Sequence, residues 1–205
     1  LISNELPEGL SVSLSVEGVE GNVLTGDLSG IIEAATYRIS GDLTIAEDDT
    51  VYLNAGTQFL FDGEYSFYIY GTLKAIGTES DSIIFDNYGD DKWRGFTLEN
   101  CSDQTIFEYV RISGAEKDDG GGMSLDNSNP TLTHVTITDN MADWGGGIFL
   151  VNSNLTLTNS IIWDNSPESF YLLLATPLIT FSDIEGGWEG EGNIDINPFN
   201  FLRFI

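Results

Sequence analysis

The sequence is poor in several residue types from which functional sites are built. Its 205 residues include one cysteine, one histidine, and seven Lys and Arg against 33 Asp and Glu. The lone Cys101 excludes an intrachain disulfide and a cysteine-based metal cluster, and the lone His134 cannot build a zinc site. The formal net charge of -26 repels the phosphates of nucleic acid and the anionic face of a membrane. We therefore expect no nucleic-acid partner.

Long apolar runs are also missing. The longest, "FYLLLATPLI" and "FLRFI", fall short of the roughly 18 residues that span a bilayer. No membrane insertion is expected. The chain opens at Leu1 without a charged and apolar leader, so we expect any export signal to have been removed or to lie outside this sequence. Composition shifts nowhere sharply enough to require a second core.

The excess of carboxylates leaves three interpretations open. It suits an ordinary solvated surface, it suits high salt, and it suits calcium, because clustered carboxylate oxygens bind hard divalent cations. Calcium is accordingly the one cofactor predicted.

What the sequence does contain is a repeat. "GGGMSLDNSNPTLTHVTITDN" (120–140) and "GGGIFLVNSNLTLTNSIIWDN" (145–165) lie 25 residues apart and agree at 13 of 21 positions. Apolar residues alternate within each copy, and Gly, Asn, Asp and Pro separate the alternating runs, which is typical of short strands. A unit of this size cannot close its own core, so successive units must stack about 4.8 Å apart. The pattern predicts a parallel β-solenoid.

The same pattern extends in both directions. One period earlier, Phe107, Val110 and Ile112 match Leu132, Val135 and Ile137. After a two-residue change in the turn, "GFTLENC" (95–101) matches "GMSLDNS" (122–128). We expect about seven coils between 37 and 205. The first 36 residues are expected to form a β-rich lead-in that caps the open first coil. The ending "NPFNFLRFI" is apolar enough to plug the last coil or to bind a neighbour.

Recurring asparagines are predicted to form ladders at the turns. Asn140 and Asn165 fall one period apart, and a second set falls at another place in the coil, namely Asn100, Asn127 and Asn152. Stacked asparagines can pass amide hydrogen bonds from coil to coil. Their predicted role is structural.

These elements resemble a known family. The GGGI and WDN elements, the upstream "SGDLTIAEDDTVYLNAGTQFLFDG" and "YGTLKAIGTESDSIIFDN", and "SDIEGGWEGEGNIDINPF" resemble right-handed parallel β-helix repeat proteins of the pectate-lyase-like superfamily. They look most like secreted, multi-modular surface proteins of marine and Bacteroidetes-type bacteria. The resemblance implies a right-handed all-β helix and an extracellular or cell-surface location. It leaves function open, because this scaffold hosts lyases, hydrolases, epimerases and adhesins.

Catalytic motifs of that superfamily find little support. Arg111 lies on the outward parity of its strand, with Thr136 and Ile161 as its expected neighbours in later coils, which is a poor setting for a lyase base. His134 is followed by valine, where polygalacturonase-like hydrolases have His-Gly. No catalytic residue is assigned.

Two kinds of binding residue are predicted. Loop and turn carboxylates are the candidate calcium ligands, with "YGDDKW" as a further acidic turn; the predicted ligands are Asp118, Asp119, Asp143, Asp139 and Asp164. Tryptophans near the turns offer flat faces on which sugar rings stack, and the candidates are Trp93, Trp144 and Trp188.

The sequence therefore favours a non-catalytic, extracellular β-helix module of a longer chain. It would act as a rigid spacer and as a surface for adhesion or for binding polysaccharide or a cell-surface glycan. The alternative is a calcium-dependent lyase or epimerase that acts on acidic polysaccharide. An ice-binding solenoid is a further alternative, although its threonine ladder, Thr131 and Thr133 with Thr156 and Thr158, covers only two coils.

Overall fold

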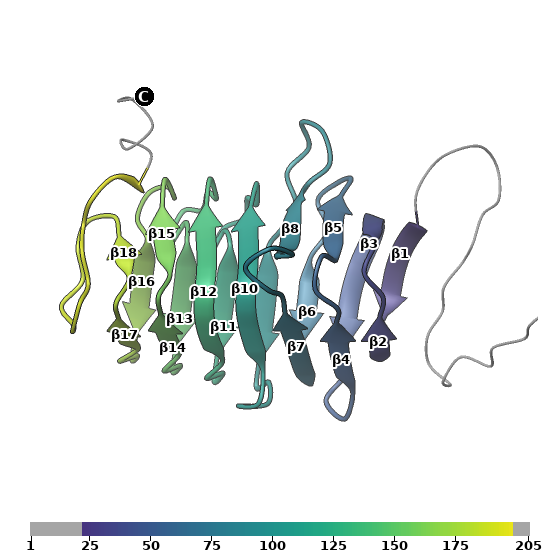
Figure 1. Ribbon diagram of the computed structural model, residues 1–205, viewed down its shortest axis with the longest axis horizontal. Helices are drawn as coiled ribbons and strands as arrows, with labels where there is room; N and C mark the ends of the chain where they lie inside the picture. The colour runs from purple at the N-terminus through teal and green to yellow at the C-terminus, as the bar shows by residue number, and fades with distance from the viewer. Residues whose placement is uncertain (1–21, 199–205) are drawn as a thin grey trace, which may run out of the picture.

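Residues 22–198 form a rod of short strands that are wound around one apolar core. The computed structural model describes these residues, and the strands of this part pair only in parallel (Figure 1). The strands make three stacks that run the length of the rod. A strand that bends at a corner contributes to two stacks.

Stack A begins with the second halves of two bent strands, β1 (Asn22–Asp27) and β3 (Thr36–Ile45). Five whole strands follow: β6 (Phe67–Ile69), β9 (Phe96–Glu99), β11 (Met123–Asp126), β13 (Ile148–Val151) and β16 (Phe170–Leu173). Stack B contains β2 (Gly30–Ile32), β4 (Thr50–Leu53), β7 (Thr72–Ile76), β14 (Thr156–Thr158), β17 (Leu178–Thr180) and the first halves of β10 (Ile106–Ser113) and β12 (Thr131–Thr138).

Stack C contains the remaining halves of the bent strands, which are β1, β3, β10 and β12, together with β5 (Gln58–Phe61), β8 (Ile83–Asn87), β15 (Ile161–Trp163) and β18 (Asp183–Ile184). The sequence of stacks along the chain is C, A, B and then C again. This order confirms the predicted parallel solenoid.

The predicted register of the repeat is confirmed. Leu132 pairs with Leu157 and Ile137 pairs with Ile162, as the 25-residue offset requires. Phe107 pairs with Leu132, and Phe96 pairs with Met123 across the two-residue change in the turn.

The number of coils is smaller than expected. One inward position of stack C recurs through six steps of register, in the order Tyr37, Phe59, Phe85, Ile112, Ile137, Ile162 and Ile184. Six turns therefore separate Tyr37 from Ile184, where about seven were expected. The loops after β7 and β8 lengthen the coils between Phe59 and Ile112, and the segment beyond Ile184 adds only a partial coil, through a bridge between Asp183 and Ile194.

Parallel pairing begins inside the segment that was predicted to be the lead-in. β1 pairs with β3, and β2 pairs with β4. The rest of that segment, residues 1–21, lies outside the described residues, as does 199–205 at the other end. Within 22–198 no helix is long and apolar enough to cross a membrane.

The inward side chains stack as continuous rows. The early coils are filled by aromatic rings: Phe59, Phe67, Phe85, Phe96 and Phe107 are all 0% exposed. Phe85 and Phe96 meet edge to face with their centroids 4.8 Å apart, a favoured geometry for aromatic pairs. The later coils are filled by aliphatic side chains at the same positions. Each coil covers the core of the one before it, which holds the corners at a fixed spacing.

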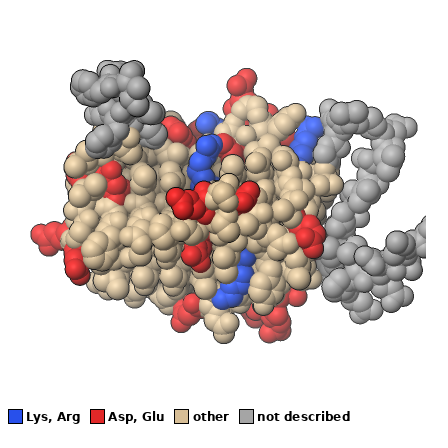
Figure 2. All heavy atoms as spheres, in the orientation of Figure 1, with Lys and Arg blue, Asp and Glu red and all other residues tan. Residues whose placement is uncertain are grey.

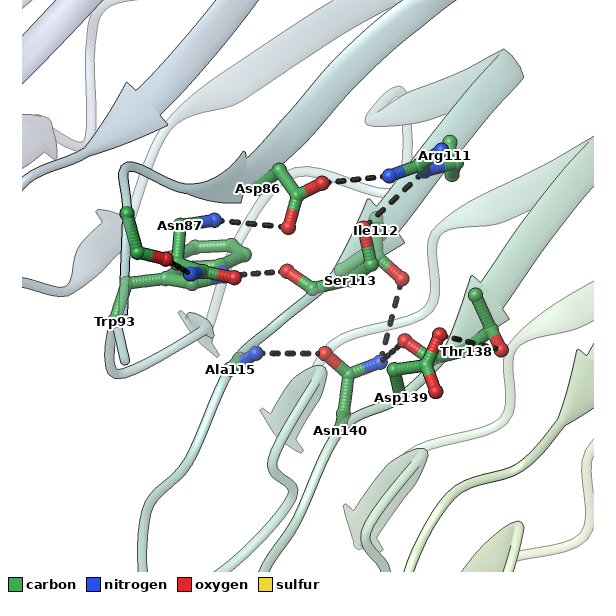
Figure 3. Close-up of polar contacts among 11 residues, drawn as sticks. Asp86, Asn87, Trp93, Arg111, Ile112, Ser113, Ala115, Thr138, Asp139 and Asn140 are labelled. Carbon is green, nitrogen blue, oxygen red and sulfur yellow. Dashed lines mark hydrogen bonds and ion pairs between the residues drawn. The ribbon is translucent and has the colours of Figure 1, made fainter. Parts of the chain in front are cut away.

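One asparagine pair forms a buried ladder. The Asn140 side-chain nitrogen donates to the Asn165 side-chain oxygen at 3.0 Å, and the backbone nitrogen of Ala115 donates to the side-chain oxygen of Asn140 at 3.0 Å. Figure 3 shows Asn140 between the backbone of Ala115 and that of Ile112. Asn140 and Asn165 are 2% and 6% exposed.

The other predicted set behaves differently. Asn100, Asn127 and Asn152 stack at the corner between stacks A and B, but their side chains are exposed and, within 22–198, donate no amide hydrogen bond to one another. Their φ angles of 51°, 47° and 47° show why asparagine occurs here, because it tolerates the left-handed conformation. The coil-to-coil bonds at this corner come instead from serine. The Ser128 hydroxyl accepts from Cys101 N, and the Ser153 hydroxyl accepts from Ser128 N.

Candidate functional site

The corner that joins stack C to stack A has the most elaborate loops of the described chain. We call it the C–A corner, and it comprises 62–66, 88–95, 114–122, 139–147, 164–169 and the segment from 185 to 193. By contrast, in the later coils the turn from stack B to stack C centres on a single left-handed residue, for example His134 and Asn159. Figure 1 shows the loop after β8 extending beyond the neighbouring corners. Long loops on a rigid scaffold commonly hold binding residues, so a binding site is expected at this corner.

All three candidate tryptophans lie in C–A corner loops, but Trp93 is not a sugar platform. Its side chain is 0% exposed, and its ring stacks on Phe61 with the centroids 4.2 Å apart. Its indole nitrogen donates to the backbone oxygen of Ser113 at 2.8 Å, as Figure 3 shows. The loop folds back over the core and uses Trp93 as its anchor.

Trp144 is placed as a platform requires. It is 52% exposed, and its ring lies 5.1 Å from that of Tyr171 in the next coil. Tyr171 in turn stacks on Phe149 at 5.3 Å. Phe149 and Tyr171 are register partners on the outward face of stack A. Three aromatic rings thus form one partly exposed group, which we call the Trp144 cluster.

Trp188 borders a small cleft at the C-terminal end of the same corner. Its ring is partly buried and lies 5.0 Å from that of Phe170, tilted by 53°. The cleft has a volume of about 200 Å³ and is lined by Glu168, Ser169, Phe170, Ile184, Glu185 and Trp188, with two glycines.

A larger groove lies nearer the N-terminus on the same corner. Its volume is about 450 Å³, and its lining comes from loops of three successive coils: Gly63, Glu64, Asp90, Asp91, Lys92, Arg94 and Glu116. Arg94 and Glu64 form a long ion pair of 3.7 Å. The groove therefore contains two basic groups among four carboxylates.

Lys117 is the residue after Glu116 of this groove, and its pKa is unusually low. Its ammonium group donates to the backbone oxygen of Phe96 at 2.8 Å and to the Thr97 hydroxyl at 3.1 Å. Burial of the ammonium lowers the pKa of Lys117 to about 7, and the positive charge of Arg94 lowers it further, against an opposing effect of Asp119. An amine of this kind is partly neutral at neutral pH.

The predicted calcium ligands do not converge. Asp118, Asp119 and Asp143 are exposed on stacked loops, where the backbone nitrogen of Asp143 donates to the backbone oxygen of Asp118. Asp139 and Asp164 are exposed left-handed residues of adjacent coils. Within 22–198 no three Asp, Glu, His or Cys side chains are grouped so that they could hold a metal ion. The described residues therefore offer no preformed calcium site.

Arg111 and His134 have structural contacts. Arg111 pairs in register with Thr136, which pairs with Ile161 in the following coil, as predicted. The Arg111 guanidinium donates to the Asp86 carboxylate at 2.6 Å (Figure 3). His134 is exposed at a corner and stacks on Tyr109 with the centroids 4.5 Å apart. Neither lies in the groove or the cleft. In the orientation of Figure 1, Figure 2 shows acidic side chains spread across the rod, with basic ones in only a few places.

The fold and the corner together define a class of protein, a parallel β-solenoid whose core fixes the spacing of one elaborated corner. Residues 29–183 match the family model described as "Right handed beta helix region", which is more than half of the chain. The chain therefore belongs to the right-handed β-helix family. Comparison with curated proteins and with solved structures gives no match.

Sequence reasoning missed Lys117, the groove and the cleft. The groove joins loops from three coils whose lengths differ, so no spacing in the sequence aligns Glu64, Arg94 and Glu116. A usable signal was the distribution of basic residues. Four of the seven in the whole chain fall within the 26 residues 92–117, namely Lys92, Arg94, Arg111 and Lys117.

Proposed function

We propose that this chain is a non-catalytic β-helix module of a larger secreted or cell-surface protein, and that it binds an extended polysaccharide along the C–A corner. The module would also act as a rigid spacer, in the manner of the multi-modular bacterial surface proteins that the sequence resembles. Adhesion to a glycan-coated surface would be the result. Other modules of the longer chain are its expected covalent partners.

The observation that carries this proposal is the Trp144 cluster. A tryptophan that is half exposed, although it sits beside two further rings, leaves apolar area in water that a sugar ring can cover. Two polar residues of the same outward row are Ser124, one coil before Phe149, and Thr97, two coils before it. Hydroxyl groups of this kind can accept and donate hydrogen bonds to sugar hydroxyls.

The regularity of the rod supports a polymer as ligand. Successive coils repeat about every 4.8 Å along the axis, so the groove, the Trp144 cluster and the cleft follow one another along a single corner. An extended chain that lies parallel to the axis would touch all three. Because the core fixes their spacing, little conformational entropy is lost when the ligand binds.

Affinity electrophoresis and calorimetry with a panel of polysaccharides test the proposal. We expect Trp144→Ala to weaken binding of the ligand that the panel identifies by about tenfold, equivalent to about 1.4 kcal/mol. Tyr52→Ala is the matched control, because Tyr52 is 49% exposed but lies on stack B. Equal affinities for the wild type and Trp144→Ala would refute the assignment of this corner.

A second candidate function, a polysaccharide lyase, is favoured by Lys117. In such a reaction an amine takes the proton next to a uronate carboxylate, the bond to the glycosidic oxygen breaks, and that oxygen takes a proton from solvent. Lys117 has a pKa of about 7, which suits a proton acceptor, and Arg94 would pair with the carboxylate. The two contacts of the ammonium, with Phe96 O and Thr97, suit a purely structural role equally well.

Ultraviolet absorbance of the new carbon–carbon double bond distinguishes the two functions. Pectate and alginate would be incubated with the protein, with calcium and with a chelator. Turnover that disappears in Lys117→Met and persists in Lys74→Met would establish the lyase. Absence of turnover under both conditions would leave the binding module.

A further inference from the structure

The cleft beside Trp188 has a composition that differs from the rest of the corner. Two rings, Phe170 and Trp188, form part of its wall, and two carboxylates, Glu168 and Glu185, flank them. No Lys or Arg lines it. Aromatic faces together with carboxylates attract a cation, because the face of the ring and the carboxylate both present negative potential.

Both carboxylates are held in place by backbone donors. One oxygen of Glu168 accepts from Gly145 N at 2.7 Å, and one oxygen of Glu185 accepts from Asp164 N at 2.8 Å. Among the described residues, the second oxygen of each carboxylate has no hydrogen-bond donor. Each side chain is thus positioned by one oxygen and has another left for a ligand.

The surrounding charge reinforces the preference for a cation. Between 118 and 198 the chain has twelve Asp and Glu and no Lys or Arg. The half of the rod that holds the cleft therefore has a negative potential that raises the local concentration of cations and repels anions. An acidic polysaccharide would be disfavoured at this end.

The cleft is continuous with the Trp144 cluster. Gly145, which donates to Glu168, is the residue after Trp144, and Tyr171, which contacts Trp144, is the residue after Phe170. A volume of about 200 Å³ is below the roughly 300–1,000 Å³ of sites that enclose a whole small molecule. It fits one unit of a polymer whose other units lie along the corner.

We propose that the cleft binds the ammonium group of an amino sugar, so that the polysaccharide bound along the C–A corner is a polymer that contains unacetylated 2-amino sugars. This inference rests on the proposed binding function and specifies its ligand. The ammonium group contacts Glu168 and Glu185, and the sugar ring lies against Trp188. The next sugar unit reaches the Trp144 cluster.

The test compares two ligands that share one backbone and differ at the 2-amino position. Chitosan hexamer has free amines, and the fully N-acetylated hexamer has the same backbone without the positive charges. Calorimetry at mildly acidic pH, where the amines are protonated, is expected to show binding of chitosan hexamer at least about tenfold tighter than of the acetylated hexamer. Added salt is expected to weaken the binding of chitosan hexamer.

Variants separate the cleft from the general negative charge. Glu168→Gln combined with Glu185→Gln keeps acceptor oxygens for Gly145 and Asp164 and removes two charges. Glu189→Gln combined with Glu191→Gln removes two exposed charges from the same end outside the cleft lining. We expect the first pair to weaken binding of chitosan hexamer about tenfold and the second pair to change it less than twofold.

Several outcomes would overturn the inference. Equal binding of both hexamers, or equal losses in both double variants, would show that the cleft does not select an ammonium group. Tighter binding of an oligolysine peptide than of chitosan hexamer would assign the cleft to a basic protein partner. Binding of a neutral polysaccharide that depends on Trp144, without binding of chitosan hexamer, would reject this inference and retain the binding function. Unchanged affinity of Trp144→Ala for both the neutral polysaccharide and chitosan hexamer would reject the proposed binding along the C–A corner itself.

Discussion

Replacing Asn140 with alanine should destabilise the protein more than replacing any exposed asparagine of the corners. The Asn140 side chain accepts from Ala115 N, and its nitrogen donates to Ile112 O at 3.3 Å, to Thr138 O at 2.9 Å and to Asn165. Alanine removes all four contacts at a site that is 2% exposed. Water cannot replace them without entering the core.

The magnitude follows from the groups that lose partners. A buried polar group without a hydrogen bond costs about 1–3 kcal/mol, and the backbone N–H of Ala115 is the clearest such group. The carbonyl oxygens of Ile112 and Thr138 lose one donor each, and the amide leaves a small void. We therefore expect Asn140→Ala to lower the free energy of unfolding by about 3–5 kcal/mol. That is a large part of the roughly 5–15 kcal/mol of a typical domain.

Asn127→Ala is the matched control. Asn127 also recurs at the repeat period, but it is exposed, its φ is 47°, and its side chain has no hydrogen bond among the described residues. Alanine there loses only the tolerance of asparagine for left-handed backbone, about 1 kcal/mol or less. Urea unfolding followed by circular dichroism measures both variants. A loss below 1 kcal/mol for Asn140→Ala, or equal losses for the two variants, would refute the argument that the ladder stabilises the core.

Two further predictions concern other parts of the C–A corner. The pKa of Lys117 is about 7 in the folded protein and near 10.5 in the unfolded chain, so the unfolded chain binds more protons between these two pH values. The free energy of unfolding should therefore rise by a few kcal/mol as the pH increases across this window. Urea titrations at several pH values should show this rise in the wild type and not in Lys117→Met. Parallel profiles for the two proteins would contradict it. Gly146→Ala should lower the midpoint of thermal unfolding by several degrees, because the added methyl would lie 2.1 Å from the backbone oxygen of Ser166. Gly56→Ala is the control. Its nearest atom would be 3.8 Å away, so this variant measures the cost of left-handed backbone without the clash.

The stacked core could be predicted from the sequence because its signal is periodic. Leu132, Leu157 and Ile179 are register partners that follow one another at the inward positions of stack B. Hydrophobic burial requires an apolar residue at each such position, so the 25-residue offset is visible without a structure. The coil count failed where loops changed length, since an insertion in a corner leaves the inward rows intact.

The side chains of the corners could not be predicted in the same way. Asn127 and Asn140 recur at the same period, yet one is exposed and the other buried. The difference lies in the backbone: Asn127 is itself left-handed, whereas Asn140 follows the left-handed Asp139, which turns the chain so that the next side chain points inward. Trp93 gave no periodic signal because its loop occurs once, and only the fold shows that the loop closes over Phe61.

The C–A corner holds the longest loops of the described chain, and they vary in length without disturbing the core. In the later coils the B-to-C turn centres on one left-handed residue, with φ between 50° and 54° at Tyr109, His134, Asn159 and Phe181. In the earlier coils it is longer, 54–57 and 77–82, and the flanking strands still keep their pairing. The C–A loops already range from five residues, 62–66, to nine residues, 114–122, while the strands on both sides keep their pairing. The other corners of the described chain also vary, but only here do the loops reach eight and nine residues, in 88–95, 114–122 and 139–147. The aromatic cluster, the groove with the basic residues and the acidic cleft occupy this corner because its long loops place side chains outside the stacked core.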